Sequence, residues 1–140
     1  MSRFEIHPQL LADCHRLGRL AFCHVLLNKN GVLPWFILVP ESETTDLLDL
    51  ADAQRTAAIN EAAVMGQFIQ HHLGYAKINF AAIGNVVPQL HLHIVGRKPD
   101  DACWPAPVWG HLSESRDYSA ERVAEIRELL ARYCSLKVAL

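Results

Sequence analysis

Two histidines that stand two residues apart, His91 and His93, mark the segment of this chain best suited to chemistry. The segment reads Gln89-Leu90-His91-Leu92-His93-Ile94-Val95. Successive side chains of a β-strand point to opposite faces, so a strand here places Gln89 and both histidines on one face and the leucines in the core. A neutral imidazole can attack an electrophile at neutral pH, and a second imidazole can donate a hydrogen bond. The pattern therefore predicts a nucleophile and a donor held side by side on a rigid strand.

Two other interpretations of this histidine pair stay open. A half-exposed surface strand produces the same alternation without any function, and His-x-His on a strand can donate two nitrogens to zinc. A zinc site needs a third ligand, and the candidates are His24, His71, His72 and His111. Nothing in their spacing places one of them beside His91. We therefore rank metal binding below covalent catalysis and expect neither a metal nor another cofactor.

Apolar spacing and turn residues divide the chain into the elements that must position these histidines. Apolar residues that recur at three- and four-residue intervals predict helices. Short runs rich in β-branched and aromatic residues, bounded by Gly, Pro and Asn, predict strands. The predicted helices are residues 8–21, about 49–72 and 119–134, and the predicted strands are residues 22–27, 35–39, 75–81 and 90–96.

This order of elements indicates an α+β fold. We expect a mostly antiparallel sheet of about five strands, with the long helix packed on one face and a further helix at the C-terminus. We also expect residues 1–140 to form one domain, in which residues 1–100 are the motif-bearing core and residues 101–140 form a tail and the last helix. The Trp-Pro segment 104–110 cannot continue a ladder, because proline lacks a donor.

Charge and hydropathy exclude several classes of protein. The 140 residues carry a net charge of -2, and the 13 basic residues form no stripe or block, so we expect no nucleic-acid partner. No apolar run approaches the ~20 residues needed to cross a bilayer, and the first residues lack the apolar stretch of a secretory signal. Four cysteines are scattered without a C-x-x-C pair. We expect a cytoplasmic protein with no membrane contact.

The motif and the residues before it resemble the histidine triad (HIT) family. This family carries His-φ-His-φ-His-φ-φ, where φ is apolar, and this chain has Gln-φ-His-φ-His-φ-φ at positions 89–95. The similarity covers roughly the first hundred residues, including the strand that ends at Pro40, the long helix, Ile78-Asn79 and Gly84-Asn85. The resemblance implies a HIT-like fold and a homodimer.

The resemblance also implies a function. Members act as hydrolases or nucleotidyl transferases on the α-phosphate of nucleoside phosphoramidates or dinucleoside polyphosphates, so the expected partner is a purine nucleotide or nucleotide conjugate. The family's nucleophile corresponds to His91, which would form a nucleotidyl-histidine intermediate. The matching role of His93 is to donate an N–H to a phosphate oxygen in the transition state.

Four further residues match positions at which the family binds its substrate. Asn79 corresponds to a polar residue that contacts the phosphate or leaving group, and Asn28 to one that contacts ribose. Gly84 and Asn85 allow main-chain amides to approach a phosphate. Ordinary turn formation explains Asn28 equally well, and a simple tight turn would also use Gly84 and Asn85.

Three positions depart from the family pattern. Gln89 replaces the first histidine of the triad, Val86 stands where a hydroxyl residue is common, and Trp35 stands where some relatives have a histidine. An amide at position 89 still donates and accepts hydrogen bonds, so His91 stays competent if this position orients the nucleophile through either its side chain or its main chain. The alternative function is a nucleotide-binding or regulatory module with low activity. Trp104 and Trp109 are expected near the site rim and the dimer interface, although packing over the core would explain them too.

Overall fold

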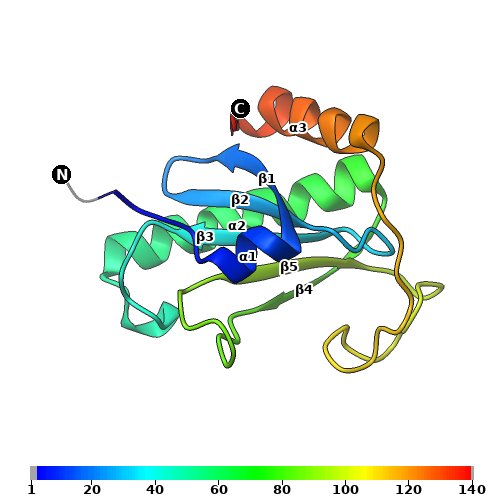
Figure 1. The fold of residues 1–140 in the computed structure, drawn as a ribbon, viewed down its shortest axis with the longest axis horizontal. Coiled ribbons are helices and arrows are strands. Elements are labelled where there is room, and N and C mark those ends of the chain that lie inside the picture. The colour runs from blue at the N-terminus through cyan, green and yellow to red at the C-terminus, as the bar shows by residue number, and fades with distance from the viewer. Residues whose placement is uncertain (1–2, 140) are drawn as a thin grey trace.

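An antiparallel sheet of six strands forms the centre of the computed structural model, which describes residues 3–139 (Figure 1). In chain order the elements are α1 (Pro8–Asp13), β1 (Cys14–Arg19), β2 (Cys23–Asn28), β3 (Trp35–Pro40), the 3-10 helix η1 (Leu47–Asp49), α2 (Asp52–Leu73), β4 (Lys77–Ala81), β5 (Leu92–Arg97), α3 (Ala120–Cys134) and β6 (Lys137–Val138). The strand order across the sheet is β4-β5-β3-β2-β1-β6. The predicted α+β fold is confirmed. The outermost residues of the predicted domain, Met1, Ser2 and Leu140, lie outside the described residues.

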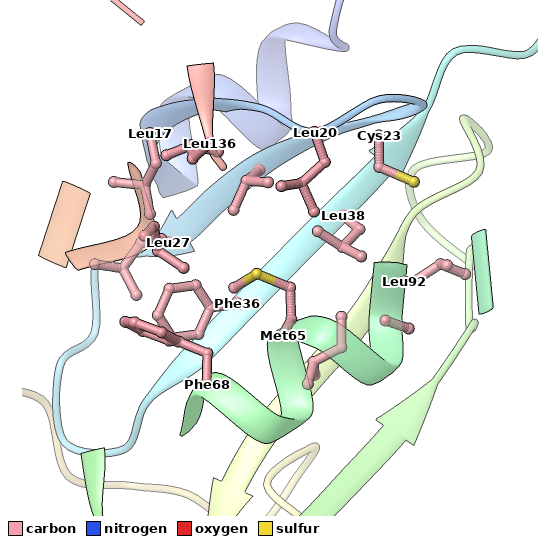
Figure 2. Packing of buried hydrophobic residues seen from close by; sticks show 14 of the residues in the cluster. Leu17, Leu20, Cys23, Leu27, Phe36, Leu38, Met65, Phe68, Leu92 and Leu136 are labelled. Carbon is pink, nitrogen blue, oxygen red and sulfur yellow. The ribbon is translucent and has the colours of Figure 1, made fainter. Parts of the chain in front are cut away.

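The main core lies between the sheet and the helices α2 and α3. Figure 2 shows how side chains from β1, β2 and β3 meet Met65 and Phe68 of α2, with Phe36 edge-on to Phe68. Leu92 and Ile94 of β5 and Leu90 just before it enter the same cluster, as the alternation in the motif predicts. One face of β5 is therefore fully occupied by packing, which leaves the opposite face for His93.

The opposite face of the sheet carries α1 and a smaller apolar cluster. Leu10 of α1 packs there against Leu26, Ile37 and Val39 from the central strands and against Val87. The short helix α1 therefore covers the face of the sheet opposite to the one that α2 and α3 cover (Figure 1). None of the helices within residues 3–139 is long and apolar enough to cross a membrane.

The predicted helix over residues 8–21 is wrong in its second half. The helix ends at Asp13, and the next six residues form β1, which pairs antiparallel with β2. Cys14 packs into the cluster on the α1 face and Leu17 into the main core on the other face. A spacing of three residues suits one face of a helix, but it equally suits opposite faces of a strand. The apolar pattern was therefore ambiguous at this point.

The last strand, β6, was not predicted, and it pairs with the edge of β1 beside Gly18. A Cβ atom at Gly18 would lie 2.1 Å from the carbonyl oxygen of Lys137. Glycine is required at this position because the two main chains approach so closely. The predicted end of the long helix agrees with the structure, since Gly74 caps α2 in the left-handed conformation (φ 77°).

Candidate functional site

A cleft of about 360 Å³ opens on the α1 face of the sheet and contains both histidines of the motif. Five of the seven residues predicted for the site line this cleft, namely Asn28, Gly84, Asn85, His91 and His93. Gln89 and Asn79 do not line it. The structure therefore brings together residues from the end of β2, the loop before the motif and β5.

The walls of the cleft are mostly apolar. Leu10 of α1 and Ile37 of β3 face it, together with Val87 from the loop. Asp13 contributes the one carboxylate among the described lining residues, and Gln9 donates to both of its oxygens at 3.0 and 3.1 Å. An apolar cleft with few polar groups suits a flat ring such as a nucleobase. Neither Gln9 nor Asp13 was singled out from the sequence, because α1 was predicted without a face directed at the motif.

His91 is held by the main chain of the residue that replaces the family's first histidine. Its Nδ1 atom lies 2.7 Å from the carbonyl oxygen of Gln89. A carbonyl only accepts hydrogen bonds, so Nδ1 of His91 carries the proton and donates it. In the neutral ring the Nε2 atom then has a free lone pair. His91 is 7% exposed, and within residues 3–139 its Nε2 has no hydrogen-bond partner.

His93 has the opposite arrangement of protons. Nε1 of Trp35 donates to Nδ1 of His93 at 3.0 Å, which leaves the ring proton on Nε2. Burial, and secondarily the nearby His91, lowers the pKa of His93 to about 4. The ring centroids of His91 and His93 are 5.0 Å apart. A bare imidazole nitrogen therefore stands beside an imidazole N–H, which is a nucleophile beside a hydrogen-bond donor.

The side chain of Gln89 points away from the cleft. It accepts a hydrogen bond from the main-chain N–H of His7 at 2.7 Å and donates one to the carbonyl of Glu5 at 2.9 Å. The predicted strand began at residue 90, but β5 begins at Leu92, so Gln89 precedes the regular alternation. The side-chain amide of Gln89 thus binds the segment that leads into α1, while the main-chain carbonyl of Gln89 orients His91.

Asn79 lies on β4, away from the cleft. It pairs with Val95 of β5, and its Oδ1 accepts a hydrogen bond from Arg97 at 2.9 Å. Arg97 is also paired with Asp101 at 2.8 Å, and both side chains are 1% exposed. The phosphate contact expected of Asn79 stays a prediction. The sequence signal for this buried pair, an arginine at the end of an apolar strand with an aspartate four residues later, was missed.

The Trp-Pro segment contributes one of its tryptophans to the cleft. Trp109 lines it and packs edge-on against both Trp35 and His93, with ring centroids 5.9 and 5.2 Å apart. Trp104 instead lies over the guanidinium of Arg97 at 5.7 Å. The position expected for the tail at the site rim therefore fits Trp109.

The residues considered as a third zinc ligand lie elsewhere. His24 is bound to Glu41 at 2.8 Å, His72 stacks on Tyr133, and none of the four candidates lines the cleft. No group of three or more histidine, cysteine or acidic side chains in the part of the chain that the structure describes is arranged to hold a metal.

Comparisons with known proteins agree with this fold. The family model of the HIT domain matches residues 10–100. A histidine triad protein from Marinobacter aquaeolei VT8 is 35% identical, with 97% of this chain and 100% of that chain covered and a TM-score of 0.88. One from Bradyrhizobium japonicum is 33% identical (92% and 96% covered, TM-score 0.85), and one from Sinorhizobium meliloti 1021 is 27% identical (93% and 96% covered, TM-score 0.87). No curated protein matches the chain.

The fold and the paired imidazoles are those of a small α+β protein of the histidine triad class. The chain belongs to the histidine triad family, whose members are generally nucleotide hydrolases or transferases and often act as dimers.

Proposed function

We propose that this protein hydrolyses or transfers a nucleoside monophosphate by attack of His91 on the α-phosphorus of a purine nucleotide conjugate. The substrate class is a nucleoside phosphoramidate or a dinucleoside polyphosphate. The observation that carries the proposal is the bare Nε2 of His91 beside the Nε2–H of His93. A neutral imidazole needs no separate base, and the neighbouring N–H favours charge that develops on a phosphate oxygen.

The reaction takes place in two displacements. The lone pair on Nε2 of His91 forms a bond to phosphorus, and the bond from phosphorus to the leaving amine or phosphate breaks. The attacking ring becomes positively charged, and its Nδ1–H donates to the carbonyl of Gln89, which stabilises that charge. Water then attacks the phosphorus of the nucleotidyl-histidine, the bond from phosphorus to Nε2 breaks, and the surplus proton of the water passes to solvent. This step releases the nucleoside monophosphate and returns His91 to its neutral form. Val86 at the cleft offers no hydroxyl, so the leaving group takes its proton from water.

The rest of the cleft suits the nucleoside and its phosphate. Oδ1 of Asn28 already accepts from the main-chain N–H of Asn30 at 2.9 Å, which leaves the NH₂ group of Asn28 to donate to a ribose hydroxyl. Gly84 has a positive φ of 66°, and this turn presents the amides of Gly84 and Asn85 to a phosphate. Leu10 and Ile37 are the apolar surfaces for the base.

The rival function is a binding or regulatory module of low activity, since Gln89 and Val86 depart from the family pattern. The position of Gln89 favours the enzyme. Its contact with His91 is made by the main-chain carbonyl, which is present whatever the side chain. The substitution at this position therefore leaves the nucleophile oriented.

The test is turnover of adenosine phosphoramidate and diadenosine polyphosphates, measured as AMP released. His91→Asn should lower the rate by about a thousandfold or more, because the nucleophile is lost. His111→Asn is the matched control, since His111 is exposed and lies outside the cleft. Undiminished turnover by His91→Asn would contradict the proposal. Tight nucleotide binding without turnover by the unmodified protein would favour the rival, and loss of activity on chelation would favour a metal site.

We also infer that the protein acts as a homodimer of one-domain subunits in the cytoplasm. β4 lies at the edge of the sheet, and Phe80 on it is 43% exposed beside Ile59 of α2, which is 41% exposed. These two side chains line an apolar groove of about 380 Å³. A second copy pairing edge to edge would cover both the strand and the groove. Light scattering should find a dimer for the unmodified protein and a monomer for Phe80→Glu, whereas a monomeric unmodified protein would contradict the inference.

A further inference from the structure

Trp35 contacts His93 across two neighbouring strands. Trp35 begins β3, where it pairs with Val95, and the side chains of Trp35 and His93 both face the cleft. The two side chains share the 3.0 Å hydrogen bond from Nε1 of Trp35 to Nδ1 of His93. An indole nitrogen can only donate, whereas an imidazole nitrogen can either donate or accept. A histidine in place of Trp35 would be free to accept, so the direction of this bond is specific to tryptophan.

The surroundings of His93 contain little that would favour a charged ring. The side chain is 8% exposed, and aromatic rings of Trp35 and Trp109 lie on two of its sides, with centroids 5.9 and 5.2 Å away. The titratable groups that line the cleft with it, among the described residues, are His91 and Asp13. His91 supplies no negative charge to balance a charged ring at His93, and the carboxylate of Asp13 already accepts two hydrogen bonds from Gln9. A neutral His93 with a single proton fits this environment.

We propose that Trp35 is a positioning residue that fixes His93 as the neutral tautomer with its proton on Nε2, so that His93 presents a donor to the phosphate. The proposal rests on the function proposed above. Without the indole N–H, Nδ1 of His93 could carry the proton instead, and the bare Nε2 would then repel a phosphate oxygen rather than bind it. The departure from the family at position 35 thus sets the state of the second motif histidine.

The direct test is the tautomer of His93, read from ¹⁵N NMR spectra that distinguish protonated from bare ring nitrogens. In the unmodified protein at pH 7 we expect a bare Nδ1 and a protonated Nε2. In Trp35→Phe we expect a mixture of both tautomers and uptake of the second proton at a higher pH. Trp109→Phe is the matched control, because it also removes an indole N–H near His93, but one with no hydrogen-bond partner among residues 3–139. Its spectrum should match that of the unmodified protein.

The kinetic consequence follows from the same change. Trp35→Phe should lower kcat about tenfold at pH 7 with KM changed less than twofold, since part of the population has lost its donor. Trp104→Phe, whose ring lies over Arg97 outside the cleft, should keep kcat within twofold. If Trp35→Phe does not fold, the isosteric residue 3-benzothienylalanine at position 35 keeps the ring shape and removes only the N–H.

The spectrum and the kinetics separate the two proposals. A protonated Nδ1 in the unmodified protein, or an unchanged His93 spectrum in the position-35 variants, would overturn the role of Trp35 whether or not nucleotides are turned over. The expected spectra in a protein that has no turnover would support the role of Trp35 in setting the tautomer and would contradict the proposed function.

Discussion

The two ends of β5 bury polar side chains in opposite ways. At the cleft end, the Nδ1 atoms of His91 and His93 are hydrogen-bonded, and their Nε2 atoms have no partner among residues 3–139. At the far end, Arg97 and Asp101 are charged, buried and paired. The hydrogen bonds that Arg97 donates to the carboxylate of Asp101 raise the pKa of Arg97. Burial would raise the pKa of Asp101, but hydrogen bonds from Arg97 and from main-chain N–H groups hold it at about 2.

The two ends of β5 therefore have different roles: the cleft end carries the reactive groups, and the far end stabilises the fold. A buried ion is tolerated only when its hydrogen-bonding capacity is filled. The oxygens of Asp101 accept from Arg97 and from the N–H groups of Lys98, Cys103 and Trp104, so this end holds the tail in place. A neutral imidazole needs less compensation, which leaves one nitrogen of each ring free for chemistry at the cleft end. We expect variants at the two ends to change different quantities.

The largest change in stability should come from Asp101→Ala. The variant leaves the guanidinium of Arg97 buried without its partner, which costs about 3–5 kcal/mol of unfolding free energy. Urea unfolding measures this loss. Asp52→Ala is the control, because the ion pair of Asp52 with Arg55 lies at the surface and its loss should change stability by less than about 1 kcal/mol. Equal effects of the two variants would contradict the contrast between the ends.

Acid should destabilise the two ends in separate pH ranges. The pKa of His93 in the folded protein, about 4, lies below the usual 6.5, so the unfolded chain binds more protons and stability falls as the pH drops from 6.5 to 4. This loss is on the order of 3 kcal/mol. Asp101 loses its contribution only as the pH falls from 3.8 to about 2. The unfolding free energy of the unmodified protein should approach that of His93→Asn as the pH falls from 6.5 to 4. If the two curves stay parallel over this range, His93 is not the source of the acid sensitivity at the cleft end.

Gln89→Ala should weaken substrate binding while leaving the chemical step nearly intact. The variant keeps the carbonyl that orients His91 but loses both side-chain bonds to residues 5 and 7, so α1 is held less firmly over the cleft. We expect KM to rise about fivefold and kcat to change less than twofold, in line with a loss of about 1 kcal/mol. Hydrogen exchange at the His7 amide should become faster. A large fall in kcat would instead assign the side chain of Gln89 to the chemistry.

The smallest change in turnover should come from Asn79→Ala. Asn79 accepts a hydrogen bond from Arg97 and does not line the cleft, so kcat and KM should stay within twofold in this variant. The unfolding free energy should fall by about 1 kcal/mol, because that hydrogen bond is lost. Asn28→Ala is the comparison at the cleft end, where loss of a ribose contact should raise KM about tenfold. A loss of turnover in Asn79→Ala would restore the phosphate contact that the sequence predicts for this residue.

The sequence predicted the parts of this molecule that depend on local patterns. Alternation over residues 89–95 placed Leu92 and Ile94 in the core, and Gly74 marked the end of α2, because each signal lies within a few residues. The same local reasoning failed at β1, where the spacing of Cys14 and Leu17 fits a helix as well as a strand.

Contacts between distant residues could not be predicted from one sequence. The partner of the Gln89 side chain lies 82 residues away, and that of His93 lies 58 residues away at Trp35. The contact with Trp35 decides which nitrogen of His93 carries the proton, and both contacts exist only once β3, β5 and α1 are assembled. The sequence therefore indicated the imidazoles but not the tautomer of His93.

The most direct test of the central claim is to locate the covalent intermediate. Protein mixed briefly with adenosine phosphoramidate, denatured and digested should yield the peptide containing His91 with the added mass of one nucleoside monophosphate. Peptide fragmentation should assign that mass to His91, and His91→Asn should show none. A nucleotidyl group on a different residue, or turnover by the unmodified protein and by His91→Asn alike with no adduct in either, would contradict the account.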